Sequence, residues 1–401
     1  MPEFFADFHL HSRYSRACSK DLTIAELAKW AKLKGLTVLG TGDFTHPLWM
    51  QELQTALRDT GTGLYEHAGQ RFLLTAEVNT LFYVDGKCHQ IHHLLFAPSL
   101  ESAGRITQEL SAFGSLSIDG RPMLKMSAER LVEVVLGIEP RAAVVPAHVW
   151  TPHFGVFGSN TGFDRLEACY GAQTQHIFAM ETGLSSDPAM NWRSSANARY
   201  TLISNSDAHS ARKIGREANR FDCALTYDAI LGAMQDPRQG FLGTLEFFPE
   251  HGKYHLDGHR ACHARLTPAE TKQRGGLCPV CGRKVTVGVL HRVDTLADRP
   301  DGFVPPGAPT FQRMVPLEEI ISQALDVGTG TKTTAQAYFK LVGHCGTEFH
   351  ALLEAPAEVL RQAAPEAIVE AILAVRLGQV VVEPGYDGEY GTVRLADAAA
   401  A

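Results

Sequence analysis

Apolar and polar positions along residues 1–245 alternate as short strands and longer helices. Apolar residues recur at helical spacing over 127–137. The clearest helix covers 23–35, "TIAELAKWAKLKG", where Thr23 and Glu26 fit a capping box and Gly35 a C-terminal stop. Alternating strands and helices predict an α/β fold, either a barrel or a doubly wound sheet. Short apolar or β-branched runs predict strands at 36–40, 71–79, 90–97, 142–148, 176–182 and 200–209.

The pattern changes after residue 245. Residues 246–299 have few long apolar runs and many His, Cys and Gly, and 299–309 ("RPDGFVPPGAP") is typical of a linker. Residues 316–375 have a helical pattern, 378–395 suggest a short β-hairpin or an ordered tail, and the final "ADAAAA" is expected to fray. We therefore predict three regions, 1–245, 246–299 and 300–401.

Composition narrows the class of protein. With 401 residues, 45% hydrophobic and 20% charged, the chain is typical of globular proteins and too long for one average domain. Its net charge of -7 gives no global basic signature for nucleic acid, although a local basic patch is compatible with it. No signal peptide or apolar run of membrane-spanning length is visible, so we expect no membrane association. Eight cysteines, scattered apart from Cys278 and Cys281, favour a reducing, cytoplasmic setting.

Potential metal ligands fall at strand ends. His9 and His11 in "DFHLHSRYSRACSKD" (7–21) are two residues apart, so in a strand both imidazoles point to one face. Two surface histidines are the alternative for this pair alone. Asp43, His148 and Asp207 each follow an apolar run, and in α/β barrels the carboxyl ends of the strands carry the active site. The eighteen histidines fit metal chemistry.

Taken together, six short motifs resemble the PHP family, the polymerase and histidinol phosphatase superfamily of metal-dependent phosphoesterases. In "TGD", Asp43 stands where that family usually has the histidine of TDH. The resemblance implies a distorted (β/α)7 barrel with up to three metal ions. The motifs are "HLH" (9–11), "GTGDFTH" (40–46), "AEVN" (76–79), "IHHLL" (91–95), "PAHVW" (146–150) and "SNSDAHS" (204–210).

The same resemblance implies the ligands. One metal would take His9, His11, Glu77 and Asp207, and a second would share Glu77 and add His92 and His148. A third would take Asp43 and His209, with Cys18 either a further ligand or a free thiol. The adjacent His93 is the alternative to His92, because neighbours on a strand face opposite ways. Glu77, Asp207 and His148 would be the catalytic residues, and His46, His89 and His153 surface, supporting or substrate-contacting residues.

Clustered divalent ions suit phosphoester hydrolysis, because they neutralise phosphate oxygens and lower the pKa of a bound water to about 7. Histidine and carboxylate ligands suit Zn²⁺, Mn²⁺ or Fe, and Mg²⁺ or Mn²⁺ could serve activity. A PHP module that keeps the barrel but has lost catalysis is the alternative. It is disfavoured because nearly every ligand position is filled.

A second metal site is predicted in residues 246–299. His259 and Cys262 form one close pair and Cys278 and Cys281 another, the pattern of a closed tetrahedral structural zinc site. His263 could replace His259. A redox CxxC is the other alternative, but no thioredoxin-like βαβ pattern surrounds this one.

The same region carries nine Lys/Arg against six Asp/Glu, a net charge of +3. Such residues either contact phosphates or form an ordinary solvated surface. We predict DNA contacts from Arg260, Arg283 and Lys284, and Arg265, Lys272 and Arg274 share the region. The "GTGTKTTAQAYFKLVGHCG" segment (328–346) matches no Walker A motif, so it gives little support for nucleotide binding.

Nearly the full chain resembles the endonuclease Q family. The resemblance rests on "DFHLHSRYSRACSKD", "GTGDFTHPLW", "IHHLLFAPSLE", "ETGLSSDP", "SNSDAHS", "GKYHLDGHR", "CPVCGRKVTVGVLHRV" and "TLADRP". It implies a DNA repair nuclease that cuts 5′ of deaminated bases (uracil, hypoxanthine or xanthine) or abasic sites, leaving 3′-hydroxyl and 5′-phosphate ends. Damaged DNA would be the partner, and the sequence reveals nothing about a replication clamp.

Cutting beside a base implies that the base is flipped into a pocket. Trp150, Phe154, Phe157 and the "ETGLSSD" loop are candidates to line it or to contact DNA, and ordinary packing is the alternative for each. The rival functions are a small-molecule phosphoesterase, such as a histidinol-phosphate phosphatase, and a non-catalytic DNA-binding module. The former leaves the zinc region and about 150 C-terminal residues without a role.

Overall fold

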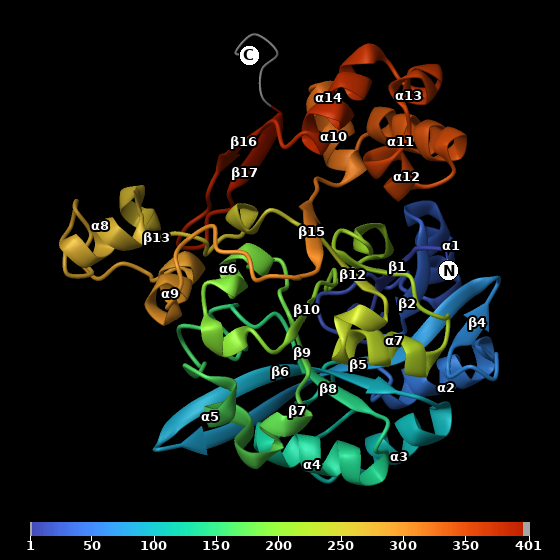
Figure 1. Cartoon of the computed structure of the whole chain (residues 1–401), viewed down its shortest axis with the longest axis vertical. Coiled ribbons are helices and arrows are strands. Elements are labelled where there is room, and N and C mark those ends of the chain that lie inside the picture. The colour runs from blue at the N-terminus through green and yellow to red at the C-terminus, as the bar shows by residue number, and fades with distance from the viewer. Residues whose placement is uncertain (1, 396–401) are drawn as a thin grey trace.

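The computed structural model describes residues 2–395, so the predicted frayed end at 396–401 lies outside the described residues. Figure 1 shows a large α/β body, a helical unit above it and a small module projecting to one side. No helix within residues 2–395 is both long and apolar enough to cross a membrane.

The body is a distorted barrel, as predicted. β1 pairs with β2 and β2 with β5, both in parallel, whereas β6 runs antiparallel to both β5 and β8. The short strands β9 and β10 pair in parallel as a separate sheet. The barrel strands are β1 (Phe4–Asp7), β2 (Leu36–Gly40), β5 (Gln70–Val84), β6 (Lys87–Ala97), β8 (Ala143–Pro146), β9 (Ala179–Glu181) and β10 (Thr201–Ile203).

The barrel closes through single backbone hydrogen bonds in place of continuous ladders. Val149 donates to the carbonyl of Glu181 at 3.0 Å, which joins the ends of β8 and β9. His11 donates to the carbonyl of Ala208 at 3.0 Å, which brings the segment after β10 beside the segment after β1. The carboxyl ends of these strands therefore converge, although the predicted strand 200–209 is reduced to Thr201–Ile203.

Helices cover the outside of the barrel (Figure 1). Thr23 caps the first helix by accepting from the N–H of Glu26. In a capping box the Glu26 side chain would accept from the backbone N–H of Thr23. It accepts instead from the indole N–H of Trp30 at 2.8 Å. The helices are α1 (Ile24–Lys34), α2 (Pro47–Ala56), α3 (Leu100–Leu110), α4 (Ala128–Ile138), α5 (Leu166–Tyr170), α6 (Pro188–Trp192) and α7 (Tyr227–Gln235).

The barrel sheet continues past β1. β11 pairs antiparallel with β1, β12 antiparallel with β11, and β15 parallel with β12. The chain thus leaves the sheet after β12 and returns at β15, beyond the linker-like segment. These outer strands and the remaining short ones are β11 (Ala218–Phe221), β12 (Phe241–Glu246), β15 (Thr310–Arg313), β3 (Arg58–Asp59), β4 (Tyr65–His67) and β7 (Met123–Leu124).

The projecting module lies between β12 and β15 in sequence. Its β-hairpin positions the first half of the predicted zinc site, and α8 has a complete capping box between Thr267 and Glu270. Its elements are β13 (Asp257–His259), β14 (Ala264–Leu266), α8 (Pro268–Gln273) and α9 (Val289–Leu296).

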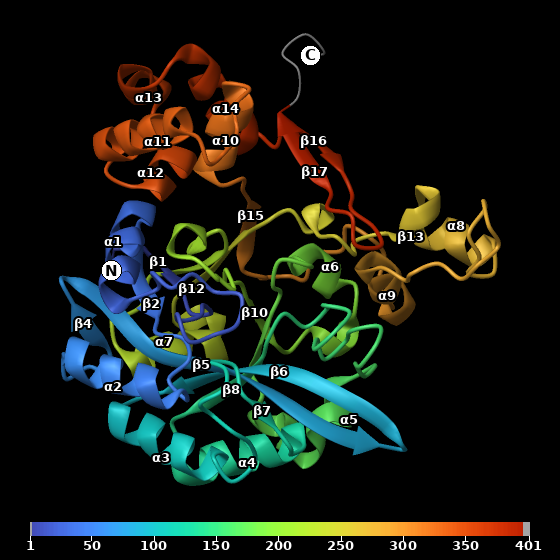
Figure 2. The same cartoon turned by 180° about the vertical axis from the view of Figure 1, so that it is seen from behind.

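The C-terminal region is helical, as predicted, and ends in the predicted hairpin. Figure 2 shows this hairpin running from the helices down to the projecting module. There Leu256 donates to the carbonyl of Gly385 at 2.9 Å, and the Arg260 N–H donates to Asp387 at 2.6 Å. The elements are α10 (Leu317–Ala324), α11 (Lys332–Cys345), α12 (Glu348–Leu353), α13 (Ala357–Ala363), α14 (Glu366–Arg376), β16 (Val380–Glu383) and β17 (Thr392–Leu395).

Candidate active site

Four side chains predicted to share a metal converge at the carboxyl ends of the barrel strands. Donor atoms of His9, His11, Glu77 and Asp207 all lie within 4.8 Å of one another. The Nε2 atom of His9 is 3.4 Å from Glu77 Oε2, and that of His11 is 3.3 Å from the same oxygen. The Nε2 atom of His11 is also 3.1 Å from Asp207 Oδ1. We call this group the first cluster.

The second cluster uses the other oxygen of Glu77. Oε1 lies 2.6 Å from His92 Nδ1 and 2.9 Å from His148 Nε2. These two nitrogens are 3.2 Å apart. A single carboxylate therefore faces both clusters, one oxygen to each, which is the arrangement of a bridging ligand.

The charges in these clusters favour cations. Although burial lowers it, the carboxylates of Glu181 and Glu77 raise the pKa of His9 well above its ordinary value. Surroundings that stabilise a proton on an imidazole also stabilise a metal ion in its place. Within residues 2–395 the fully buried Nε2 atom of His9 has no hydrogen-bond partner. A buried nitrogen that faces two carboxylates without a hydrogen bond fits a metal ligand.

The second cluster supplies neutral imidazoles. Burial lowers the pKa of His92 to about 4, so its ring is uncharged at neutral pH and keeps a lone pair for a metal. Although burial raises it, the neighbouring imidazoles His92 and His9 hold the pKa of Glu77 well below its usual range. The bridging carboxylate is therefore ionised.

Strained backbone marks the same place. Asp43, His148 and Asp207 have positive φ angles of 48°, 29° and 46°. Such conformations are uncommon for residues other than glycine and concentrate at functional sites. All three follow a barrel strand, where the chain turns sharply to direct a side chain inward.

Glu181, at the end of β9, contacts two of the predicted ligands, His9 and His148, and was not among the predicted residues. Its carboxylate lies 3.0 Å from His9 Nδ1 and accepts from the backbone N–H of His148 at 2.7 Å. The amide of Asn205 holds it from the other side at 2.9 Å. A carboxylate on the far nitrogen of a metal-binding histidine fixes the ring and strengthens it as a ligand. The available signal was an acid ending a predicted strand, in "HIFAMET".

Asp43 and His209, the predicted ligands of a third metal, do not belong to any group of three or more potential ligands that lie within 4.8 Å of one another in the described chain. Asp43 Oδ1 lies 3.0 Å from His11 Nδ1, and its Oδ2 accepts from the backbone N–H of Ser12 at 2.7 Å. The buried Asp43 therefore orients His11, as Glu181 orients His9. The His209 ring lies edge-on to His11, 4.7 Å between centroids. Burial raises the pKa of Cys18 to about 12, which keeps its thiol protonated.

The choice between adjacent histidines on β6 is set by the direction of their side chains. His92 points into the second cluster, whereas His93 faces the opposite side of the strand. There His93 lies 2.8 Å from both the Thr80 hydroxyl and the Tyr170 hydroxyl. Burial lowers the pKa of His93 to about 3, so it is a neutral core residue.

The remaining histidines of the barrel lie outside the clusters. His46 stacks on Tyr14, with 4.6 Å between ring centroids. His89 stacks on Phe163 at 4.0 Å. His153 is exposed beside Asn160.

The predicted DNA contact of Trp150 needs correction. Its side chain is 1% exposed and its indole donates to Asn191 at 2.7 Å, so it is a packing residue. Phe157 is equally buried beside it. Phe154 is partly exposed and stacks on the ring of His92, with 4.5 Å between centroids.

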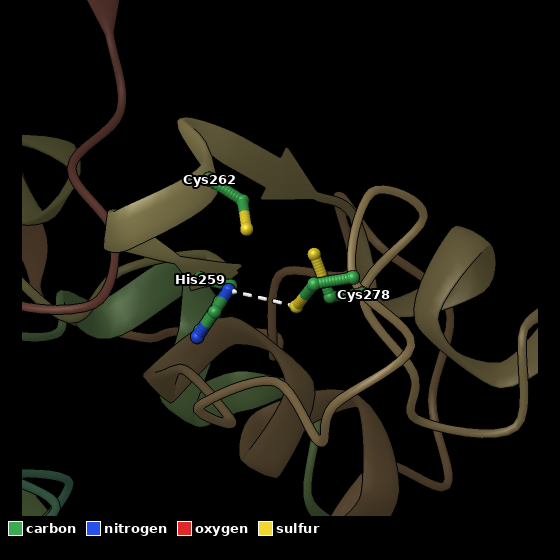
Figure 3. Close-up of side chains that lie close together, drawn as sticks. His259, Cys262 and Cys278 are labelled. Carbon is green, nitrogen blue, oxygen red and sulfur yellow. Dashed lines mark hydrogen bonds between the residues drawn. The ribbon is translucent and has the colours of Figure 1, made fainter.

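The four predicted zinc ligands of the projecting module also converge. Donor atoms of His259, Cys262, Cys278 and Cys281 lie within 4.8 Å of one another, and Cys281 Sγ is 3.5 Å from His259 Nδ1. Figure 3 shows His259, Cys262 and Cys278 pointing toward a common centre. Although burial raises it, backbone N–H groups of Cys281 and Val280 lower the pKa of Cys278 to about 6. A closed set of three sulfurs and one nitrogen fits structural zinc.

The basic residues of the module differ in whether an acidic side chain lies close enough to form an ion pair with them. Arg283 and Lys284 are exposed, and neither has an ion-pair partner within the described chain. The exposed Arg260 lies 3.9 Å from Glu389. Lys272 pairs with Asp294 at 2.6 Å.

Two neighbouring hollows lie beside the clusters, lined by residues of the barrel, the C-terminal region and the module. The larger has a volume of about 620 Å³ and is lined by His209 and the basic residues Arg212, Lys213 and Arg216. The smaller hollow has a volume of about 370 Å³ and is lined in part by Thr151. The Thr151 hydroxyl is 2.9 Å from His148 Nδ1. Both are lined by Leu184, Gly252 and Tyr390, so the hollows adjoin at these residues.

Comparisons with known proteins identify the family. The crystal structure of the lesion-specific endonuclease PfuEndoQ from Pyrococcus furiosus superposes with a TM-score of 0.89 and 31% identity, over 99% of this chain and 96% of that one. The chain belongs to the endonuclease Q family. A second endonuclease Q structure, bound to a 27-mer duplex with an abasic lesion at its active site, gives 0.87 and 30%, over 99% and 97%.

Two uncharacterized proteins are similar to this chain in sequence. The YqxK protein of Bacillus subtilis is 28% identical over 98% of this chain and all of its own length. The MJ0043 protein of Methanocaldococcus jannaschii is 29% identical over 61% of this chain and 31% of its own. Residues 316–379 match the family model of the MJ0043 C-terminal domain.

Membership of the endonuclease Q family confirms the predicted class of enzyme. The protein is a metal-dependent endonuclease of DNA repair, which hydrolyses phosphodiester bonds, and its partner is DNA. The small-molecule phosphoesterase is not favoured, because the likeness extends over the module and helices as well as the barrel.

Proposed function

We propose that this endonuclease cuts duplex DNA on the 5′ side of abasic sites and of the deaminated bases uracil, hypoxanthine and xanthine. The observation that carries the proposal is the pair of clusters bridged by Glu77, built into a chain that matches endonuclease Q along its whole length. The relative bound to an abasic duplex supports this substrate class.

The clusters are proposed to hold two divalent ions, with His9, His11, Glu77 and Asp207 on one and Glu77, His92 and His148 on the other. Such ions neutralise phosphate oxygens, make a water a better nucleophile and stabilise the leaving oxygen. The ligands suit Zn²⁺ or Mn²⁺, and Mg²⁺ is a further candidate for activity. Zinc is proposed for the His259 and cysteine site of the module.

The protein's own residues position this chemistry. Glu77 keeps the two sites at a fixed separation, because its oxygens point to different clusters. Asp207 closes the first cluster from the segment after β10. His148 closes the second, and Thr151 and Glu181 hold its ring and backbone in place.

The hollows are proposed to receive the DNA. The larger one can hold the negatively charged strand, because Lys213 and Arg216 line it and phosphate contacts position a strand without reading its sequence. The smaller one is proposed to take the extruded base. One of its lining residues, Thr151, contacts His148. The lining also includes Tyr254, Tyr390 and the buried His255, which can stack on a base and form hydrogen bonds with it.

The proposal is tested with purified protein and end-labelled duplexes that carry one abasic site, uracil, hypoxanthine or xanthine, beside an undamaged duplex and histidinol phosphate. We expect nicking of the lesion duplexes only. Release of phosphate from histidinol phosphate without nicking would favour a small-molecule phosphoesterase. Lesion binding without any hydrolysis, with several divalent metals, would favour a non-catalytic module.

A further inference from the structure

A guanidinium lies at the edge of the first cluster. The Nη1 atom of Arg121 is 3.3 Å from Glu77 Oε2. This is the same oxygen that faces the Nε2 atoms of His9 and His11 at 3.4 and 3.3 Å. The arginine and an ion in the first cluster would therefore face one carboxylate oxygen. Arg121 was not among the residues predicted from the sequence.

The backbone fixes this arginine relative to Glu77. β7 pairs in parallel with β5, and the N–H of Asn79 donates to the carbonyl of Pro122 at 2.9 Å. Because Glu77 lies two residues before Asn79 on the same strand, both charged groups are positioned by β5. The adjacent Gly120 lies so close to Asp43 and Ser15 that a side chain there would collide with both. The loop is thus packed against Asp43, the residue that orients His11.

Arg121 would lose the ion pair that balances its positive charge if a metal ion bound to Glu77. Glu77 is the one carboxylate within 4 Å of its guanidinium in the described chain. Arg121 stays protonated at every accessible pH, and an ion held by the first cluster would compensate the charge of that oxygen in its place. The side chain is 25% exposed, so an incoming anion can reach it. A phosphate oxygen matches the planar set of guanidinium donors.

We propose that Arg121 binds a non-bridging oxygen of the scissile phosphate and is a further catalytic residue of this nuclease. The inference rests on the proposed function and adds to it the group that stabilises the transition state. In the reaction, the oxygen of water bonds to phosphorus, the bond from phosphorus to O3′ breaks, and O3′ takes a proton. Arg121 transfers no proton and stabilises the negative charge that grows on the phosphate oxygens.

The test compares Arg121→Ala and Arg121→Lys with Arg130→Ala. Arg130 is an exposed arginine on α4 that pairs with Glu133, so its loss removes the same charge from a distant surface. For each protein we would measure bound metal, the melting temperature, turnover of an abasic duplex, and the affinity of the metal-loaded protein for inorganic phosphate by calorimetry. The phosphate measurement requires no turnover.

Arg121→Ala should keep the metal content and melting temperature of the wild type. Its kcat should fall by about 10²–10³, the effect of removing one transition-state donor. Phosphate affinity should fall at least about tenfold, since a charge-assisted pair is lost. Arg121→Lys should recover part of both, because it restores the charge without the planar geometry. Arg130→Ala should match the wild type throughout.

Wild-type phosphate affinity in Arg121→Ala would overturn the inference, whatever the activity. Loss of bound metal or a large drop in melting temperature would also overturn it, because Arg121 would then only support the ligands. A wild type that binds phosphate through Arg121 but leaves lesion duplexes intact would contradict the proposed substrate and leave the role of Arg121 standing.

Discussion

Glu77 is the residue on which the two clusters depend. It is fully buried, and each of its oxygens approaches two imidazole nitrogens, those of His9 and His11 on one side and of His92 and His148 on the other. Placing an ionised carboxylate there without cations would be costly, since a buried charge must be compensated. The geometry is explained if the residue evolved to bind two cations.

Asp207→Asn should abolish cleavage and preserve the fold. The substitution removes the negative charge that closes the first cluster but keeps the shape of the side chain. Asn also tolerates the left-handed backbone that Asp207 adopts, with φ of 46°. Nicking of an abasic duplex, melting temperature and DNA affinity should be compared with those of Asp228→Asn, a change of an exposed aspartate on α7. Normal nicking by Asp207→Asn would refute the assignment of the first cluster.

Among the site residues, those in short motifs were easier to predict from the sequence than isolated ones. The spacing in "HLH" predicts that the side chains of His9 and His11 share a face, because it depends only on local backbone geometry. Glu181 and Arg121 escaped prediction because their positions depend on β9 and on the loop before β7 packing against distant strands. The local sequence likewise could not show that the Asp43 carboxylate forms hydrogen bonds with His11, Ser12 and Ser15.

Among the elements, β11 and β12 bring together two buried acids, Glu217 just before β11 and Glu246 at the end of β12. The register that places Ala218 opposite Leu245 brings Glu217 opposite Glu246. Burial and the charge of Glu246 raise the pKa of Glu217 well above its usual range. Glu217 therefore stays protonated in the folded protein at pH values where it ionises in the unfolded chain. Above the ordinary Glu pKa of about 4.3, unfolding releases this proton and stability falls as pH rises.

Glu217→Gln should consequently gain stability over the wild type as pH increases. Glutamine has the shape of the neutral acid and does not titrate, so the difference in melting temperature should widen between pH 5 and pH 9. A widening of a few degrees would correspond to about 1 kcal/mol. Glu370→Gln, a change on the exposed face of α14, should show no such trend. A constant difference across this range would mean that Glu217 is ionised in the folded protein.

The projecting module should depend on its zinc site. Cys278→Ser should lose one tightly held zinc per chain and increase hydrogen exchange in residues 246–299, because a structural metal contributes folding energy directly. Metal analysis and exchange mass spectrometry would show this, with Cys345→Ser on α11 as the control. Unchanged zinc content in Cys278→Ser would exclude this cysteine as a ligand.

Strands and helices with a clear apolar period were predictable, whereas their extents were not. β5 and β6 extend beyond the predicted strands, because they form a long antiparallel pair whose register continues from Leu74↔Ala97 to Val84↔Lys87. β10 is shorter than predicted because its C-terminal half turns to present Asp207. The return of the chain to the barrel at β15 is a long-range pairing that the local pattern at 310–313 does not reveal.

Over the whole molecule, the barrel carries the metal clusters and the module and helices enclose the hollows beside them. The hairpin β16–β17 joins the helices to the module through Asp387, which accepts from the Arg260 N–H at 2.6 Å and from the Thr286 hydroxyl at 2.6 Å. We propose that the barrel supplies catalysis and that the module supplies part of the grip on DNA.

Changing Arg283 and Lys284 together to alanine should weaken binding to all duplexes alike. Each lost phosphate contact lowers the slope of log K against log salt by about 0.9. Lesion preference should survive, because phosphate contacts do not read the base. A double change of the exposed Lys125, just before α4, and the exposed Arg130, on α4, is the matched control. Unaltered binding at every salt concentration would make Arg283 and Lys284 ordinary solvated residues, and lost lesion preference would mean that the module reads the base.

The central claim is that the Glu77-bridged clusters cut a DNA strand beside a lesion. The most direct measurement maps the cut and its ends on a duplex with one uracil, using the wild type and Glu77→Gln, with and without a chelator. The account predicts one nick on the 5′ side of the uracil, with 3′-hydroxyl and 5′-phosphate ends, that disappears with the chelator and in the variant. A nick on the 3′ side, release of the free base, or cutting that survives the loss of Glu77 would contradict it.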